Sequence, residues 1–305
     1  MANPTSVAGA SPSLAPAFAA LVAGAIAMGI SPVFVRYAFA ADVGPFASAF
    51  WRVGLALPVL YAWMRFEERA AGARAPRRPF APATLLAGLF FTGDLFFWHL
   101  AILNTTVANA TFFATLAPLF VVLTVWLVLR RRVHAATFAG LALCLLGGAS
   151  LIGQSLQVDP ARIRGDLFGI ATALFFGLYF VAIERAREGT GAARVTFEAS
   201  LVTAGLLLVI AIVLDGSLLP STFAGAAALL AMAWISHAGG QGLLSVALGR
   251  LPAVFSSLVI FLEAVAAALF GSLLLGEKLT FVQAFGGALI LLGIWVARPR
   301  TGDAR

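Results

Sequence analysis

The apolar residues of this chain lie in runs of roughly twenty, and this feature limits most strongly what the chain can fold into. About 20 apolar residues are needed for an α-helix to cross the hydrocarbon core of a bilayer. Of the 305 residues, 61% are hydrophobic and 11% are charged, whereas a soluble domain carries about 25% charged residues. The sequence therefore predicts an integral membrane protein and excludes a soluble enzyme, a disordered chain and a disulfide scaffold.

The runs predict an all-α integral membrane protein with ten transmembrane helices. No Lys or Arg precedes the first run, so we expect it to be a retained span and not a signal peptide, which starts with a basic segment. The loops between runs are short and leave no room for a soluble catalytic domain. The expected spans cover residues 14–35, 46–63, 84–103, 107–129, 133–153, 165–183, 195–214, 221–248, 252–275 and 280–296.

The basic residues predict the orientation of the spans, because cytoplasmic loops of membrane proteins carry an excess of Lys and Arg. With both termini cytoplasmic, fifteen arginines fall on the inner side and four basic residues on the outer side, while Arg52 lies within the second span. The net charge of +7 is therefore interpreted as a topology signal facing anionic lipid. Nucleic acid is not an expected partner.

The chain also repeats itself. A shift of 146 residues places Gly140 on Gly286 and Gly147 on Gly293, and a shift of 148 places Gly29 on Gly177. The repeat is five spans long, with one copy at 14–153 and the other at 165–297. Because five is odd, the two copies must cross the membrane in opposite senses, and such inverted repeats are typical of secondary transporters.

The last two spans of each half carry a recurring pattern. In the second half it consists of a mid-helix Glu, a Gly-Glu turn, a Gln and two spaced glycines, at Glu263, Gly276, Glu277, Gln283, Gly286 and Gly293. This pattern resembles the EamA family of the drug/metabolite transporter superfamily. The chain departs from the family at Ala264, where a Pro is usual, and at Arg131, where the first half lacks the second Glu; the first half keeps the Pro as Pro118.

The resemblance covers essentially the whole chain and implies two inverted five-helix repeats in the cell inner (plasma) membrane, with both termini cytoplasmic. It also implies export of small metabolites, among which the amino-acid exporters, including the YddG type, are the best known. It does not supply the substrate.

Motifs of enzymes are missing from the sequence. Gly271 and Gly276 only faintly resemble a P-loop, because Glu277 interrupts the Gly-Lys-Ser/Thr step. No nucleophile elbow, His-Glu-x-x-His or Cys-x-x-Cys pattern occurs. We therefore expect no enzyme activity, no cofactor and no metal site, and transport driven by gradients.

Polar side chains inside the spans are the candidate binding groups, because they are costly at membrane depth and usually face a cavity or a partner. The third span carries an Asp and a Trp one turn apart, followed by a His. The eighth span, its mate in the repeat, carries a Trp, a His and a Gln at i, i+3 and i+7, which form one stripe on an α-helix. The expected substrate-binding residues are Asp94, Trp98, His99, Tyr179, Trp234, His237, Gln241 and Glu263.

A cavity lined by these groups suits a zwitterion with an apolar side chain. Arg52 is the only cation inside a span, which disfavours the sugar-phosphate branch of the superfamily; Arg52 itself is interpreted as paired with a carboxylate in helix packing. Each candidate also has a structural interpretation, as packing or interhelical hydrogen bonding. Glu184 and Glu198, at span ends, are expected to be solvated. The hinge candidates are Pro32, Pro118 and Pro252.

The predicted function is export of small neutral or hydrophobic amino acids, aromatic ones included, by alternating access through a central cavity. The expected partners are the small-molecule substrate and membrane lipid. Proton coupling and facilitated diffusion both stay open. The alternatives are export of other metabolites or drugs of the same superfamily, and a non-transporting membrane sensor or channel.

Overall fold

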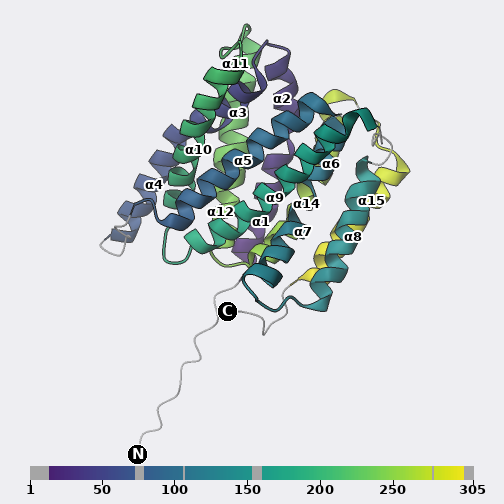
Figure 1. Cartoon of the computed structure of the whole chain (residues 1–305). Helices are drawn as coiled ribbons and strands as arrows, with labels where there is room; N and C mark the ends of the chain where they lie inside the picture. Colours follow the sequence, from purple (N-terminus) through teal and green to yellow (C-terminus); the bar gives the residue numbers. More distant parts are fainter. Residues whose placement is uncertain (1–13, 73–78, 106, 153–159, 277, 299–305) are drawn as a thin grey trace, which may run out of the picture.

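The computed structural model describes residues 14–72, 79–105, 107–152, 160–276 and 278–298, and this part of the chain contains helices and turns without any strand. The helices pack side by side as one bundle (Figure 1). The predicted all-α class is therefore confirmed. Glu277 of the predicted Gly-Glu turn, Gly153 at the end of the first repeat, and Arg74, Arg77, Arg78, Arg300 and Arg305 lie outside the described residues.

Within the described residues, seven helical segments are long and apolar enough to cross a membrane. Four of them contain a change of helix within the span. The seven are α1 (Ala15–Gly29) with α2 (Ser31–Phe39), α3 (Pro45–Gly54) with α4 (Leu57–Ala71), α5 (Pro82–Asn104), α9 (Ile163–Ala186), α10 (Ala192–Leu214), α11 (Phe223–Ala231) with η4 (Met232–Gln241) and α12 (Gly242–Leu248), and α13 (Ala253–Val259) with α14 (Phe261–Leu275).

Three shorter apolar segments coincide with the remaining expected spans. The first combines α6 (Val107–Ala114), α7 (Ala117–Leu123) and the π-helical turn η2 (Thr124–Val128); the second is α8 (Ala135–Ile152) and the third is α15 (Phe281–Ala297). A short 3-10 turn, η3 (Pro160–Arg162), leads into α9. Seven crossings follow from length and composition, and ten crossings stay a prediction.

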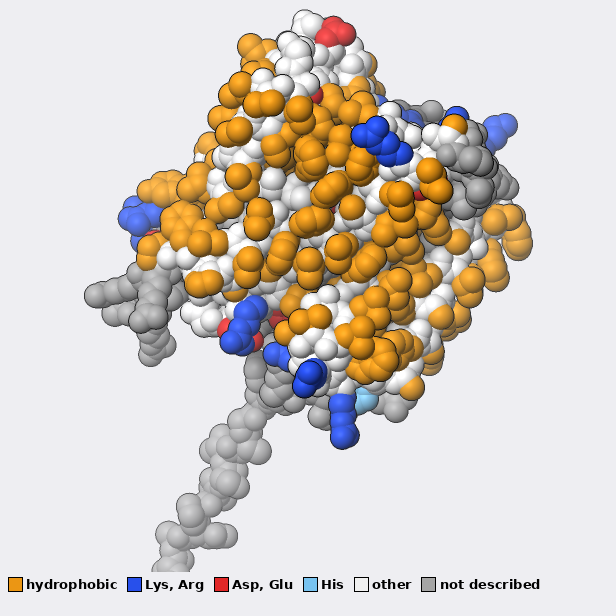
Figure 2. Space-filling view, viewed as in Figure 1, with side chains coloured by type: hydrophobic (Ala, Val, Ile, Leu, Met, Phe, Trp, Pro, Cys, Tyr) orange, Lys and Arg blue, Asp and Glu red, His pale blue; other side chains and the backbone are white. Residues whose placement is uncertain are grey.

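The outer surface of the bundle is apolar along its middle. Figure 2 shows hydrophobic side chains over the body of the molecule and the blue Lys and Arg side chains near its ends. Large side chains inside the helices, such as Leu146, Val209 and Leu291, are more than half exposed. A soluble monomer rarely exposes a continuous apolar patch of more than a few hundred Å², so this surface is built to face lipid.

Proline explains three of the interruptions inside spans, because it lacks the N–H that continues a helix. Pro32, Pro58 and Pro118 each stand in the first turn of the second helix of their span, α2, α4 and α7. Pro252 immediately precedes α13. The break between α13 and α14 at Ile260 has no proline, since the chain carries Ala264 instead.

Small residues bring helices of the two halves into backbone contact. On α8 and α15, Gly140 lies against Gly293 and Gly147 lies against Gly286; a Cβ at Gly140 would stand 2.5 Å from the Gly293 carbonyl oxygen. Close approach at glycine is a common way for membrane helices to associate without a hydrophobic driving force between them.

Two carboxylates cap helices that belong to the other half of the chain. Asp215, just after α10, accepts a 2.5 Å hydrogen bond from the Ala47 N–H in the first turn of α3. Glu67, near the end of α4, accepts hydrogen bonds of 3.0 and 3.1 Å from the N–H groups of Ala192 and Ala193 at the start of α10. The capping positions themselves are glycines, Gly44 and Gly191, where a side chain would collide with the incoming carboxylate.

The expectation that Glu184 and Glu198 are solvated is wrong, because both side chains are buried. Glu198 accepts hydrogen bonds from Arg194 at 3.0 Å and from the Phe80 N–H at 2.9 Å. Glu184 lies 3.9 Å from Arg131. Burial of a carboxylate is tolerated where it is paired and hydrogen-bonded, and arginines near the span ends supply those partners.

Candidate functional site

A cavity of about 120 Å³ lies in the middle of the bundle, where the interrupted spans meet. Met28, Ser31 and Pro32 line it at the break between α1 and α2, and Thr115 and Pro118 line it at the break between α6 and α7. The α13–α14 break contributes Ser257, Ile260 and Phe261. Breaks in membrane helices free backbone polar groups and are tolerated at depth only where protein or a water-filled cavity surrounds them.

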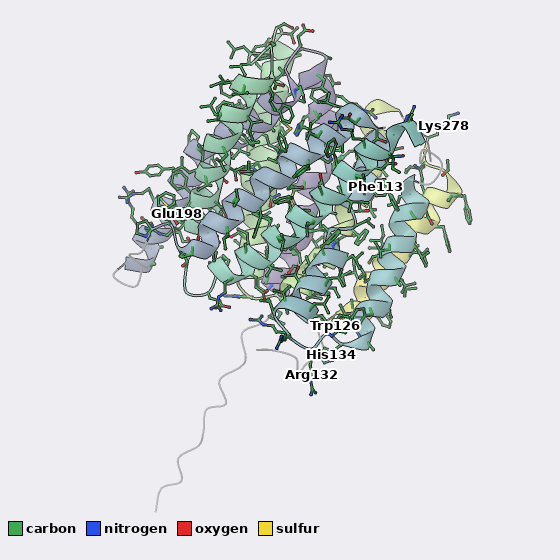
Figure 3. All side chains as sticks on the ribbon, viewed as in Figure 1. Phe113, Trp126, Arg132, His134, Glu198 and Lys278 are labelled. Carbon is green, nitrogen blue, oxygen red and sulfur yellow. The ribbon has the colours of Figure 1, made fainter. Side chains whose placement is uncertain are left out.

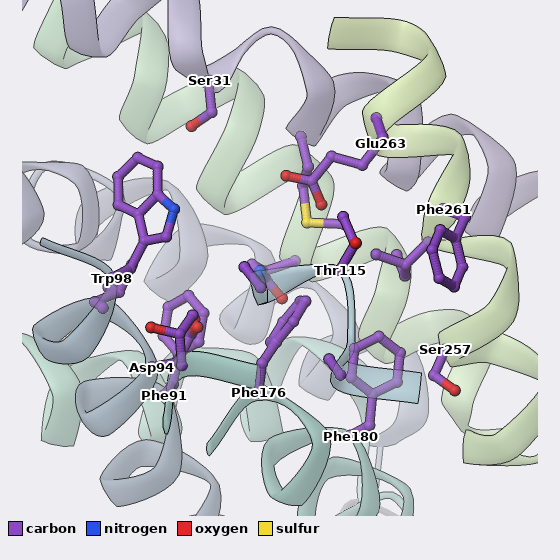
Figure 4. Close-up of a pocket in the computed structure, with 18 of the residues that line it drawn as sticks. Ser31, Phe91, Asp94, Trp98, Thr115, Phe176, Phe180, Ser257, Phe261 and Glu263 are labelled. Atoms are coloured by element: carbon purple, nitrogen blue, oxygen red, sulfur yellow. The ribbon is translucent and has the colours of Figure 1, made fainter. Parts of the chain in front are cut away.

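Three charged side chains line the cavity: Arg52 on α3, Asp94 on α5 and Glu263 on α14. In Figure 4, Asp94 points into the cavity from one side and Glu263 from the other. Arg52 is within electrostatic range of both carboxylates. Among the described residues no hydrogen bond or ion pair joins Arg52 to Asp94 or Glu263, so the interpretation of Arg52 as directly paired in helix packing is wrong.

Several polar atoms of the lining have no protein partner within the described part of the chain. These are the Nε of Arg52, the hydroxyl of Ser31 and the hydroxyl of Thr172. Buried polar groups are normally hydrogen-bonded, and an unsatisfied one costs about 1–3 kcal/mol. The arrangement fits groups that are satisfied by water or by a bound molecule.

Five aromatic rings are part of the apolar wall. Figure 4 shows them around the carboxylates: Phe91, Trp98, Phe176, Phe180 and Phe261. Phe176 packs edge-on against Phe180, with ring centroids 5.1 Å apart. Rings held by such contacts form a rigid surface that an apolar side chain can pack against.

The structure brings four of the eight sequence-predicted residues together in the lining. They are Asp94, Trp98, Gln241 and Glu263. They come from three spans: α5, η4 and α14. Their role in binding a substrate stays a prediction.

Three more of the predicted residues lie directly behind the wall. The Tyr179 hydroxyl donates to Gln241 Oε1 at 3.1 Å, and the Tyr179 ring packs 4.8 Å from that of Phe91. His237 bonds Ser200 at 2.9 Å and stacks 5.4 Å from Phe91. These two side chains therefore hold lining residues in position.

His99 also lies behind the wall. Its Nδ1 donates to the Leu95 carbonyl at 2.7 Å, and its ring lies 5.0 Å from that of Trp98. The His99 side chain is almost fully buried, so it is not solvated.

Trp234 does not face the cavity. Its side chain is 51% exposed on the outside of the bundle, and its Nε1 donates to the Leu55 carbonyl at 3.1 Å. The predicted stripe assumed α-helical periodicity, whereas Met232–Gln241 forms a π-helix. The wider i→i+5 turn changes the direction of successive side chains, so Trp234 is separated from His237 and Gln241.

Sequence reasoning missed Arg52 and the four phenylalanines as lining residues. Arg52 carried a usable signal, because it is the only Lys or Arg inside the ten expected spans. The phenylalanines carried none, since the chain has 26 of them and their spacing does not separate a cavity wall from a lipid-facing surface.

Comparison with known proteins decides the family. The sequence model of the EamA-like transporter family matches residues 15–152 and 163–298, almost the entire chain. The chain belongs to the EamA-like transporter family. The predicted resemblance is thereby confirmed, and the protein is a membrane transporter and not an enzyme.

One curated relative and one solved structure each match this EamA protein over more than nine tenths of its length. A protein of Archaeoglobus fulgidus described as an uncharacterized transporter is 28% identical over an alignment of 299 residues that covers 92% of this chain and 95% of the relative. A solved crystal structure superposes with a TM-score of 0.81 at 22% identity and covers 96% of this chain and 99% of its own. At that identity the structural likeness shows the shared fold.

Proposed function

We propose that this EamA protein exports small neutral amino acids with apolar side chains by alternating access, and that the central cavity is the substrate site. The observation that carries the proposal is the set of three separated charges, Arg52, Asp94 and Glu263, around one small aromatic cavity. The outward direction carries over from the family's exporters.

The charges match the two ends of a zwitterion. A guanidinium binds a carboxylate with paired hydrogen bonds, so Arg52, whose Nε lacks a partner among the described residues, is suited to the substrate carboxylate. Asp94 and Glu263 offer acceptors for the ammonium group. Because Arg52 is not bonded to either carboxylate, a zwitterion can bridge groups that the protein itself leaves apart.

The size and the wall of the cavity favour a compact apolar side chain. About 120 Å³ is below the roughly 300–1,000 Å³ of sites for drug-sized ligands, which speaks against large drugs. A phosphorylated sugar would need several cations at this depth, and the described lining supplies Arg52 together with two carboxylates.

Two inverted five-helix repeats, 14–153 and 165–297, are the architecture that we propose for this mechanism. The glycine contacts between α8 and α15 support this architecture. At a shift of 146, Gly140 is the mate of Gly286 and Gly147 is the mate of Gly293. When each residue of the contact Gly140–Gly293 is replaced by its mate, the result is the contact Gly286–Gly147, which is also present. A pair of contacts that exchange in this way is expected of two copies related by a two-fold axis. Substrate sites of such transporters lie near the midplane between the halves.

We further place both termini on the cytoplasmic side of the inner membrane. The ends of α4 and α9 and the starts of α8 and α10 meet at one end of the molecule, as the contacts of Glu67 with α10 and of Arg131 with Glu184 require. This arginine-rich end is the cytoplasmic side by the positive-inside rule. A C-terminal reporter found outside would contradict this orientation.

The test is counterflow in proteoliposomes with labelled leucine and phenylalanine, and with a panel of sugars, sugar phosphates, nucleotide sugars and polyamines. Two leucine analogues probe the charges: isopentylamine lacks the carboxylate and 4-methylpentanoate lacks the amino group. Arg52→Gln should raise the KM for leucine about tenfold to hundredfold while leaving competition by isopentylamine unchanged.

Trp98→Ala, which opens the cavity wall, should impair transport. Trp234→Ala is its matched control, because the same change is made on the lipid-facing side of the bundle. Equal loss in both variants would refute the assigned site. Transport of a sugar phosphate without any amino acid would refute the substrate class, and flux that does not saturate would show a channel.

A further inference from the structure

A second cavity, of about 610 Å³, lies at the arginine-rich end, where α8 begins and α15 ends. Its walls include Val125 of η2, Val254 and Phe255 of α13, and Ala297 of α15. None of the charged residues of the central cavity lines it. Its volume lies within the roughly 300–1,000 Å³ of cavities that hold organic ligands.

The charged groups around this cavity are mostly cations. Arg131, Arg132 and Arg298 line it, together with His134. The carboxylate in the lining, Glu184, lies 3.9 Å from Arg131. With that carboxylate compensated by Arg131, the site keeps an excess of positive charge and favours an anion.

Two tryptophans place the cavity at the level of lipid headgroups. Trp126 and Trp295 are 50% and 58% exposed, and each lies within two residues of the lining residues Val125 and Ala297. The guanidinium of Arg298 lies 4.8 Å from the Trp295 ring centroid. Figure 3 shows Trp126, Arg132 and His134 together at this end of the molecule. Exposed tryptophans of membrane proteins concentrate at the membrane–water interface.

From this combination of an apolar wall, a cationic rim and an interfacial position, we infer that the cavity is a binding site for the headgroup of an anionic phospholipid. The phosphodiester would accept hydrogen bonds from Arg132 and Arg298, since guanidinium groups suit phosphate oxygens. The upper parts of the acyl chains would lie along Val254 and Phe255. Basic pockets between membrane helices on the cytoplasmic side are known to take such headgroups.

The proposal is tested on the purified full-length chain in detergent, titrated with phosphatidylglycerol or with phosphatidylcholine, with retained lipid counted by native mass spectrometry. Arg132→Gln combined with Arg298→Gln should weaken phosphatidylglycerol binding at least about tenfold. The matched control combines Arg65→Gln with Arg69→Gln: it removes the same charge at the same end of the molecule, but on the exposed face of α4, which does not line the cavity.

Retention of phosphatidylglycerol over phosphatidylcholine by the wild type and the control, and its loss in the cavity variant, is the expected result. An equal loss in both double variants would overturn the proposal, because it would show attraction by net charge alone. Displacement of the lipid by millimolar inorganic phosphate would overturn the lipid assignment in favour of a free anion. Unchanged lipid binding with an altered transport KM would show a substrate vestibule instead.

Discussion

The contact between α8 and α15 allows a single methyl group to be tested against the packing of the two halves. In Gly147→Ala, the new Cβ would stand 2.5 Å from the Gly286 carbonyl oxygen and 3.0 Å from the Ile290 nitrogen, where ordinary contact begins at 3.4 Å. Both neighbours are backbone atoms of α15 and cannot rotate away. The helices must therefore separate by about 0.9 Å at this point, and overpacking of this kind costs about 1–3 kcal/mol.

Alanine is also a better helix former than glycine by about 1 kcal/mol, so the measured change mixes two effects. Gly287→Ala on α15 separates them, because its Cβ would meet only Val265, at 3.9 Å. The free energy of unfolding, measured by titration with a denaturing detergent in bicelles, should therefore be lower in Gly147→Ala than in Gly287→Ala by about 1–3 kcal/mol. Equal stability of the two variants would refute the close backbone contact.

Three further changes test other parts of the structure. Gly29→Ala should lower the free energy of unfolding by about 1–3 kcal/mol, because its Cβ would stand 2.6 Å from a Cβ of α14. Gly205→Ala is the control, because its Cβ would meet nothing within 4 Å, and it should not lower this free energy. A stable Gly29→Ala variant would contradict the packing of α1 against α14. Glu67→Ala should lower the free energy of unfolding by about 0.5–2 kcal/mol through loss of the α10 cap, while Glu188→Ala, at an exposed carboxylate paired with Arg185, should change it little. Burial raises the pKa of Asp215 above its ordinary 3.8, against the opposing effect of backbone hydrogen bonds, so the folded chain takes up its proton at a higher pH than the unfolded chain. Wild type should accordingly gain stability relative to Asp215→Asn as the pH falls from 7 towards about 4, and parallel pH profiles of unfolding would contradict this.

The fold was predictable where one physical rule dominates. Long apolar runs specify membrane helices, because every backbone polar group must be satisfied inside lipid, and the predicted spans coincide with the helical segments. Glu184 and Glu198 were expected to be solvated because they stand at span ends. Arg131, the partner of Glu184, becomes visible only once the helices are packed, whereas Arg194, the partner of Glu198, lies four residues earlier on α10 and was a signal in the sequence.

The candidate site was partly predictable for a similar reason. Ionisable groups are rare enough in the spans that Asp94 and Glu263 stood out, and both line the cavity. Trp234 was misplaced because a π-helix cannot be recognised from residue spacing that also fits an α-helix. Arg52 was visible but was interpreted as paired in helix packing, and only the folded structure shows that neither Asp94 nor Glu263 is bonded to it.

The proposed repeat also distinguishes residues that hold the two halves together from residues that line the central cavity. The two carboxylate caps that join the halves are mates in the repeat. A shift of 147 places the capping glycine Gly44 on Gly191, and a shift of 148 places the capping carboxylate Glu67 on Asp215. Each cap therefore has a counterpart at the opposite end of the bundle.

The charges of the cavity do not recur. A shift of 146 places Asp94 on Gly240 and Ala117 on Glu263. Arg52 lies between Gly44 and Glu67 in the sequence, so the shift that applies to it is 147 or 148, and its mate is Ala199 or Ser200. Symmetric contacts are what two exchangeable conformations require, since an interaction lost at one end can be replaced by its counterpart at the other. Because the charged groups have no such counterpart, the scaffold does not need them for exchange between conformations, and this asymmetry favours their assignment to the substrate.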